Sequence, residues 1–146
     1  AGTPVLTVSG PRAIEEIQPG DLVLSQDVNT GKLAYQPVVD TTVRPESPIT
    51  SIRTVRDEVI RATGGHAFWV SGTGWVQASK LASGMRLHAL GGGVGISEVA
   101  PVSDQRAYNL VVADFHSYFV GVGNVLCHDN MLLEPTNAIM PGLAEN

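Results

Sequence analysis

The sequence predicts an all-β domain in which many short strands are joined by tight turns. Glycine (16 residues) and proline (9) are plentiful in the 146-residue chain, and valine and threonine are frequent. No stretch shows the sustained periodicity of a helix, and apolar residues alternate with polar ones over short runs between turn-forming residues. At this length the chain is most simply one domain, long enough to bury a core.

Composition and charge argue against several classes of protein. The formal net charge is −5, acids and bases are scattered, and no basic run or aromatic-and-arginine stripe is present. We therefore expect neither nucleic acid nor an anionic membrane as a partner. No apolar run is long enough to span a bilayer, and the start lacks a signal-peptide pattern. A single cysteine, Cys127, excludes an internal disulfide framework but leaves the compartment open.

The first half of the chain reads as strands separated by turns. The expected strands cover residues 1–8, 22–25, 33–36, 38–43, 49–55 and 58–62. Asn29-Thr30-Gly31 and Arg56-Asp57 are the expected hairpin turns. Pro45 and Pro48 interrupt the pattern, so a loop is predicted at Glu46–Ser47.

The second half continues in the same way to about residue 130. The expected strands are 68–70, 75–77, 108–112, 116–120 and the run starting at Val125, with a hairpin tip at 91–95. Residues 1–130 would then form the domain and 131–146 an irregular tail that adds no strand. Leu132, Leu133 and Ile139 would anchor this tail to the surface.

A short internal repeat predicts two similar supersecondary units. Ile14-Glu-Glu-Ile17-Gln-Pro-Gly20-Asp-Leu-Val23 and Ala78-Ser-Lys-Leu81-Ala-Ser-Gly84-Met-Arg-Leu87 share one spacing. In each copy two apolar residues three apart are followed by glycine and then by an apolar strand residue. We expect the copies to be related by a pseudo-two-fold axis.

The stretch from Arg61 to Val70 carries the chemistry. Gly64 and Gly65 allow a tight turn or a positive φ, and Phe68 to Val70 read as a half-buried strand. Such a turn would bring the Thr63 hydroxyl and the His66 imidazole to one site. The turn amides could then bind a carbonyl oxygen while the imidazole donates to an amide nitrogen. Taken alone, this spacing favours a surface histidine beside a turn threonine over a catalytic pair.

Several blocks, taken in order, resemble a known family. They are Ala-Gly-Thr-Pro-Val at residue 1, Ile-Gln-Pro-Gly-Asp at 17, Thr-Gly-Gly-His-Ala-Phe-Trp-Val at 63, Tyr-Asn-Leu-Val-Val at 108, Phe-His-Ser-Tyr-Phe-Val at 115 and Val-Leu-Cys-His-Asp-Asn at 125. This order is similar to that of Hint domains, the fold shared by hedgehog autoprocessing domains, inteins and bacterial intein-like domains, including those of polymorphic toxins. The resemblance covers residues 1 to 130. It implies a flattened horseshoe of bent strands whose two ends meet at one site.

The resemblance also implies a single-turnover self-processing reaction with no cofactor and no metal. In such domains an N-terminal Cys or Ser attacks the preceding peptide carbonyl to give a thioester or ester. The T-x-x-H pair, here Thr63 and His66, polarises that amide and protonates its nitrogen. A terminal Asn later cyclises with help from two histidines, for which His128 and His116 are the candidates.

The start of the chain departs from the family pattern. That pattern usually begins Cys-Phe-x-Ala-Gly-Thr, whereas this chain begins at Ala1. By that alignment the nucleophile lies about three residues upstream of Ala1, and it has either been cut away or been replaced by Ala1 itself. As written, the chain is expected to be inactive for the N-terminal acyl shift.

The C-terminal end departs as well. Inteins close with His-Asn followed by Cys, Ser or Thr, but here His128 precedes Asp129, Asn130 and Met131. Cleavage after Asp129 would need a carboxylate to cyclise, and cleavage after Asn130 would leave His128 one residue out of register. Met131 offers no acceptor, and Asn109 stands where inteins often carry Asp. Ligation of the flanks is therefore not expected.

Three functions stay open at this stage. The favoured one is a self-processing domain whose partners are its own flanking segments. The second is a non-catalytic Hint-like β-domain that serves as a spacer or interaction module. The third is a hydrolase acting in trans with Cys127 as its nucleophile, which we disfavour because a small thiol at an apolar strand end is usually buried and inert. A metal site of Cys127, His128 and His116 has too few spaced ligands. The oligomeric state stays open.

Overall fold

The computed structural model describes residues 2–129, so Ala1, Asn130 and the predicted tail at 131–146 lie outside it, and the predicted domain boundary stays a prediction. Within this range the chain forms strands β1 (Pro4–Thr7), β2 (Gly10–Ala13), β3 (Leu22–Gln26), β4 (Leu33–Thr54), β5 (Val59–Thr63), β6 (Ala67–Val70), β7 (Gly74–Gln77), β8 (Arg86–Ala89), β9 (Gly92–Val112), β10 (Ser117–Val120) and β11 (Val125–His128). Two single turns of 3₁₀ helix, η1 (Ile14–Glu16) and η2 (Ala78–Lys80), complete the set. No helix in residues 2–129 is long and apolar enough to cross a membrane.

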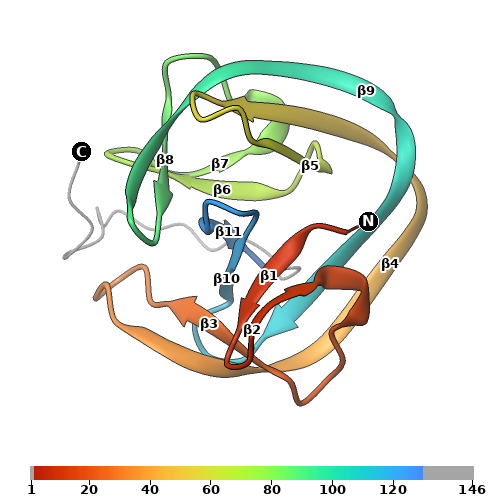
Figure 1. Cartoon of the computed structure of the whole chain (residues 1–146), viewed down its shortest axis with the longest axis vertical. Helices are drawn as coiled ribbons and strands as arrows, with labels where there is room; N and C mark the ends of the chain where they lie inside the picture. The colour runs from red at the N-terminus through yellow and green to blue at the C-terminus, as the bar shows by residue number, and fades with distance from the viewer. Residues whose placement is uncertain (1, 130–146) are drawn as a thin grey trace.

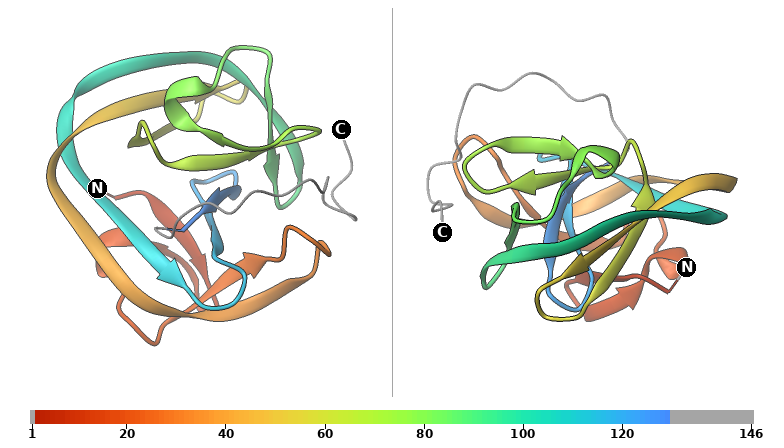
Figure 2. Two further views of the ribbon diagram at one scale, coloured as in Figure 1. Left: turned by 180° about the vertical axis from the view of Figure 1, so that it is seen from behind. Right: turned by 90° about the horizontal axis from the view of Figure 1, so that it is seen from above.

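One large antiparallel sheet organises the molecule, in the order β10-β1-β3-β4-β9-β8-β11-β6-β7, with β2 paired to β1 and β5 to β4. The long strands β4 and β9 curve around the outside of the molecule, and β10 and β11 lie near its centre (Figures 1 and 2). The predicted all-β fold, with bent strands in a horseshoe, is therefore confirmed.

The β4–β9 ladder bends where the prolines lie. The pairing shifts register between Arg44 and Ser47 and again between Ser47 and Ile49. Such bulges bend a strand and leave positions that need no ladder hydrogen bond, which is where proline is tolerated in a sheet. The predicted loop at Glu46–Ser47 is therefore wrong, because β4 runs through Pro45 and Pro48 without a break.

The predicted internal repeat is confirmed by the backbone. In each copy a single 3₁₀ turn follows a two-stranded hairpin, β1–β2 in the first and β6–β7 in the second, and leads into a second hairpin, β3–β4 or β8–β9. The glycines that end the two turns have nearly the same φ, 97° at Gly20 and 92° at Gly84.

The hydrogen bonds of the two copies also match. Ile17 N–H donates to Ile14 O and Leu81 N–H to Ala78 O, both at 3.2 Å. The Gly20 N–H donates to Val38 O at 2.8 Å, and the Gly84 N–H donates to Ile96 O at 3.0 Å. The return bonds run to the residue after each glycine, from Val38 N–H to Asp21 O and from Ile96 N–H to Met85 O, both at 2.8 Å. The glycines are thus required at positive φ, and the apolar pair in each copy points into the core.

The core lies around the central strands. All four residues of β6, β10 and β11 are buried. Phe68, Trp69 and Val70 were predicted to be half-buried, but they are fully buried because β6 pairs with β7, β8 and β11 in the interior of the sheet. Functional groups at the ends of these strands are therefore held by rigid elements.

Candidate functional site

The Thr63–His66 segment forms the tight turn that the sequence predicts. It joins β5 to β6, and the His66 N–H donates to Thr63 O at 3.0 Å. The segment η2 clamps this turn from outside, because Ala78 N–H donates to His66 O (2.8 Å) and Ser79 N–H to Gly64 O (2.9 Å).

The two glycines of the turn differ in their surroundings. Neither Gly64 nor Gly65 has a positive φ. A Cβ at Gly64 would lie 3.2 Å from the Ser79 Cβ, whereas a Cβ at Gly65 would meet nothing within 4 Å. Close packing against η2, rather than backbone freedom, therefore explains Gly64.

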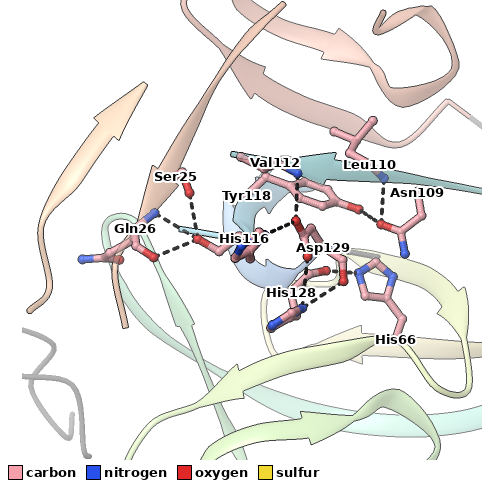
Figure 3. Close-up of polar contacts among 11 residues, drawn as sticks. Ser25, Gln26, His66, Asn109, Leu110, Val112, His116, Tyr118, His128 and Asp129 are labelled. Atoms are coloured by element: carbon pink, nitrogen blue, oxygen red, sulfur yellow. Dashed lines mark hydrogen bonds and ion pairs between the residues drawn. The ribbon is translucent and has the colours of Figure 1, made fainter. Parts of the chain in front are cut away.

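The His66 imidazole is held in one tautomer. Its Nε2 lies 3.0 Å from the carbonyl oxygen of His128, which can only accept, so the proton is on Nε2 and Nδ1 is the acceptor (Figure 3). Burial lowers the pKa of His66 to about 4, although the bond to the His128 carbonyl opposes the shift. Part of His66 stays accessible to solvent, but protein encloses the ring, with the Phe68 ring centroid at 5.2 Å. His66 is therefore neutral near pH 7.

The end of β11 presents a second histidine to the same site. His128 Nδ1 donates to the carbonyl oxygen of Asp129 at 2.9 Å. Its Nδ1 also lies 3.4 Å from the Asp129 Oδ1, and the Trp75 ring packs edge-on against it with centroids 4.9 Å apart. The polarised carbonyl is the one that links Asp129 to residue 130.

The Asp129 carboxylate is completely buried between two histidines (Figure 3). Its Oδ2 accepts the Val112 N–H at 2.8 Å and contacts His116 Nδ1 at 3.0 Å. The backbone is fixed too, because Asp129 N–H donates to His116 O at 2.8 Å. Hydrogen bonds of this kind compensate the cost of burying a charge.

His116 reaches Asp129 from an unusual backbone position. Its φ is +52°, in the left-handed region that residues with a Cβ seldom adopt. This conformation ends the turn before β10 and is compatible with both bonds to Asp129. Strain at a site of this kind is a common feature of functional residues.

Cys127 is buried in the core, whereas Asn109 is partly exposed and lines the cavity described below. Burial raises the pKa of the Cys127 thiol well above its usual range, so the thiolate that a nucleophile needs is disfavoured. Asn109 Oδ1 accepts the Tyr118 hydroxyl (2.6 Å) and the Leu110 N–H (2.8 Å). Cys127 does not line the cavity described next, so the hydrolase reading loses support.

A cavity of about 460 Å³ collects the two ends of the described chain. Thr3, beside the start, and Asp129, at the end, both line it together with Thr63, His66 and His128. Within residues 2–129 no group of three or more His, Cys, Asp or Glu side chains could hold a metal ion.

Comparison with known proteins assigns the chain to a family. The profile of the pretoxin Hint domain matches residues 4–133. The chain belongs to this Hint family. A bacterial intein-like domain from Clostridium thermocellum, known from its solution structure, is 35% identical, with 88% of this chain and 96% of that one covered and a TM-score of 0.83. No curated protein matches the chain.

Inteins share the architecture at lower identity. The MchDnaB-1 intein is 27% identical, with 88% of this chain and 97% of that one covered and a TM-score of 0.75. A DnaB intein from Synechocystis sp. PCC 6803 is 15% identical over 89% and 96% of the chains with a TM-score of 0.78, and this shows the fold alone. The Hint resemblance and the all-β fold are thus confirmed.

Within this Hint domain most of the predicted site residues meet. Thr63, His66, His128 and Asp129 line one cavity. His116 does not line it but contacts Asp129 from behind, while Ala1 and Asn130 lie outside the described residues. Sequence reasoning missed Trp75 and the Val112 amide. Neither carries a signal of its own, because each acts only through the folded position of His128 or Asp129.

Proposed function

We propose that this Hint domain cleaves its own polypeptide and releases flanking segments without joining them. The observation that carries the proposal is the shared cavity, in which Thr3 and Asp129 meet the Thr63–His66 pair. A domain that acts on bonds at its own two ends needs both ends at one set of catalytic groups.

The N-terminal step would be an acyl shift catalysed by His66. It requires a Cys or Ser upstream of Ala1, at the position that the family pattern gives it. The neutral imidazole accepts the thiol proton on Nδ1, the sulfur attacks the preceding carbonyl carbon, and the C–N bond breaks. The same proton then passes to the departing nitrogen. The bond from Nε2 to His128 O keeps the ring oriented, and the Thr63 hydroxyl with the turn amides would hold the oxyanion.

The C-terminal step would break the bond between Asp129 and Asn130. His128 Nδ1 already donates to the carbonyl oxygen of that bond, which favours it over the bond after Asn130. An Asp129 carboxyl oxygen would attack its own carbonyl carbon to form a cyclic anhydride. The nitrogen of residue 130 then leaves with a proton from the site or from water, and water reopens the anhydride. Met131 cannot accept a chain, so release would occur without ligation.

The test restores Cys-Phe and one further residue ahead of Ala1, with a reporter upstream and a strong thiol added. We expect reporter release from the parent protein and a loss of 10²–10⁴-fold in rate for His66→Ala, the usual scale for proton transfer by a positioned side chain. Thr63→Ala should lose less, because the amides stay in place.

His88→Gln is the matched control, since His88 is a buried histidine that does not line the cavity. It should release at the parent rate. Equal rates for the parent and a folded His66→Ala would leave the non-catalytic β-domain as the better description.

A further inference from the structure

We propose that the cavity selects acidic residues in the polypeptide segment that precedes the scissile N-terminal bond. The inference rests on the proposed self-processing function and names the substrate class of that same site. Three arginines from three strands carry it: Arg44 on β4, Arg61 on β5 and Arg106 on β9 all line the cavity that holds Thr63 and His66.

These three guanidinium groups are available to a ligand. All three residues are exposed, and within residues 2–129 none of them forms an ion pair. Arg12 and Arg53, by contrast, pair with Asp21 and with Asp57 and Glu98. The acids nearest to these arginines in sequence, Glu46, Glu58 and Asp104, do not line the cavity.

The charge of the cavity is opposite to that of the whole chain. The protein has 9 basic and 14 acidic residues, yet Asp129 supplies the one carboxylate among the residues that line the cavity. That carboxylate is buried and bonded to Val112 N–H and His116. A third of all basic residues thus faces a space that contains no other acid, so the field there is positive.

The path of the chain leads a flanking segment to these arginines. Arg44 pairs with Ala107, beside Arg106, at the bulged part of the β4–β9 ladder. The start of the described chain lies toward this bend (Figures 1 and 2), and Thr3 lines the same cavity. With the reacting carbonyl at Thr63 and His66, the residues on its acyl side would enter the cavity that the arginines line.

Carboxylates are the ligands that this arrangement fits. Guanidinium presents a planar fork of N–H donors that binds a carboxylate through two parallel hydrogen bonds. Because the arginines are exposed, each pair is screened by salt and adds a modest amount. We therefore expect a preference of severalfold in rate rather than an absolute requirement.

The experiment uses the reporter protein described above with Glu, Gln or Lys at the second to fourth positions before the restored Cys. Single-turnover release should follow the order Glu, Gln, Lys, with a difference of about three- to tenfold between Glu and Lys at low salt that shrinks at 1 M salt. Arg61→Glu and Arg106→Glu should remove or invert the order. Arg56→Glu changes an exposed arginine outside the cavity and should keep it.

The outcomes separate this inference from the function on which it rests. Release that depends on His66 but is equal for the three reporters would overturn the charge preference and leave self-processing intact. If no reporter is released, self-processing fails, and the preference is then read from stability. In that case the intact parent fusion with the Glu reporter should have a higher thermal midpoint than the parent fusion with the Lys reporter. This difference should be absent in the Arg106→Glu variant. Equal midpoints for the two parent fusions would overturn the charge preference.

Discussion

The bond from His128 Nδ1 to the carbonyl oxygen of Asp129 ties the identity of residue 129 to the chemistry at its own peptide bond. At this position a carboxylate must form an anhydride, whereas a carboxamide nitrogen forms a cyclic imide, the route that inteins with a terminal Asn take. In the proposed C-terminal step, residue 129 would therefore set the rate of release.

We predict that Asp129→Asn speeds cleavage of the 129–130 bond. The amide keeps an acceptor oxygen for the Val112 N–H, and its nitrogen becomes the nucleophile. An increase of tenfold or more, measured by intact-mass spectrometry, is the expected result. His128→Ala in the Asp129→Asn background should abolish the gain, because the carbonyl is no longer polarised. A product ending at residue 130 would show that cleavage occurs after Asn130 and not after residue 129.

A second residue-scale prediction contrasts the two glycines of the Thr63–His66 turn. Gly64→Ala would place a Cβ 3.2 Å from the Ser79 Cβ, so η2 must shift by a few tenths of an ångström. We expect a loss of about 1 kcal/mol in the free energy of unfolding and slower release, since η2 also holds His66 O. Gly65→Ala meets nothing within 4 Å and should unfold at the parent denaturant concentration. Equal midpoints for the two variants would contradict this account.

At the scale of elements, one carboxylate joins two turns that are distant in sequence. Glu58 follows the β4–β5 turn, and its Oε1 accepts the Gly123 N–H at 2.9 Å while its Oε2 accepts the Val122 N–H at 2.5 Å. This places the β10–β11 hairpin, whose far end carries His116 and His128. A side chain at Gly123 would displace this carboxylate, because a Cβ there would lie 2.9 Å from Glu58 Oε1.

We predict that Glu58→Ala lowers the free energy of unfolding by about 1–2 kcal/mol, since two amides lose a charged acceptor. Chemical denaturation followed by tryptophan fluorescence would measure this. Glu46→Ala is the matched control, because Glu46 is exposed and no hydrogen bond or ion pair involves its side chain within the described residues. A loss no larger for Glu58→Ala than for the control would show that the two bonds do not stabilise the fold.

Elements also show where sequence reasoning succeeds and where it stops. The repeat around Ile14 and Ala78 was readable because glycine spacing and apolar spacing are local properties, and both are required by local geometry. The continuity of β4 through Pro45 and Pro48 was not readable, because the bulges that accommodate the prolines exist only in the ladder with β9. The Thr63–His66 turn was predicted for the same local reason. The contact between His66 and His128 could not be predicted in this way. It depends on the pairing of β6 with β11, in which Phe68 lies opposite Cys127, 59 residues further along the chain.

At the scale of the whole molecule, two buried histidines couple folding to pH. Burial lowers the pKa of His66 and of His88 to about 4 in each case. His88 Nε2 donates to Gln26 Oε1 at 2.9 Å, and neither residue lines the cavity. Both rings are thus neutral in the folded protein at pH values where an unfolded chain already carries protons on them.

The sign of the effect follows from that difference. Unfolded histidine titrates near 6.5, so above this pH both states are neutral and stability is unaffected. Between about 6.5 and 4 the unfolded state binds up to two more protons at these residues, and the free energy of unfolding falls as pH falls. Each histidine contributes a slope that approaches about 1.4 kcal/mol per pH unit. The carboxyl of Glu15, whose pKa is lowered mainly by the Gly2 amide, adds its own loss only below about 4.5, at the acid end of this window.

We therefore predict a steep loss of stability between pH 6.5 and 5, measured as the free energy of unfolding in urea at half-unit steps of pH. His88→Gln removes one of the two groups and can still bond to Gln26, so it should reduce the slope by about half. The free energy of unfolding of the variant, relative to that of the parent, should therefore rise as the pH falls from 7.5 to 5. Identical slopes for parent and variant would show that His88 binds its proton in the folded state as well, so that burial does not lower its pKa.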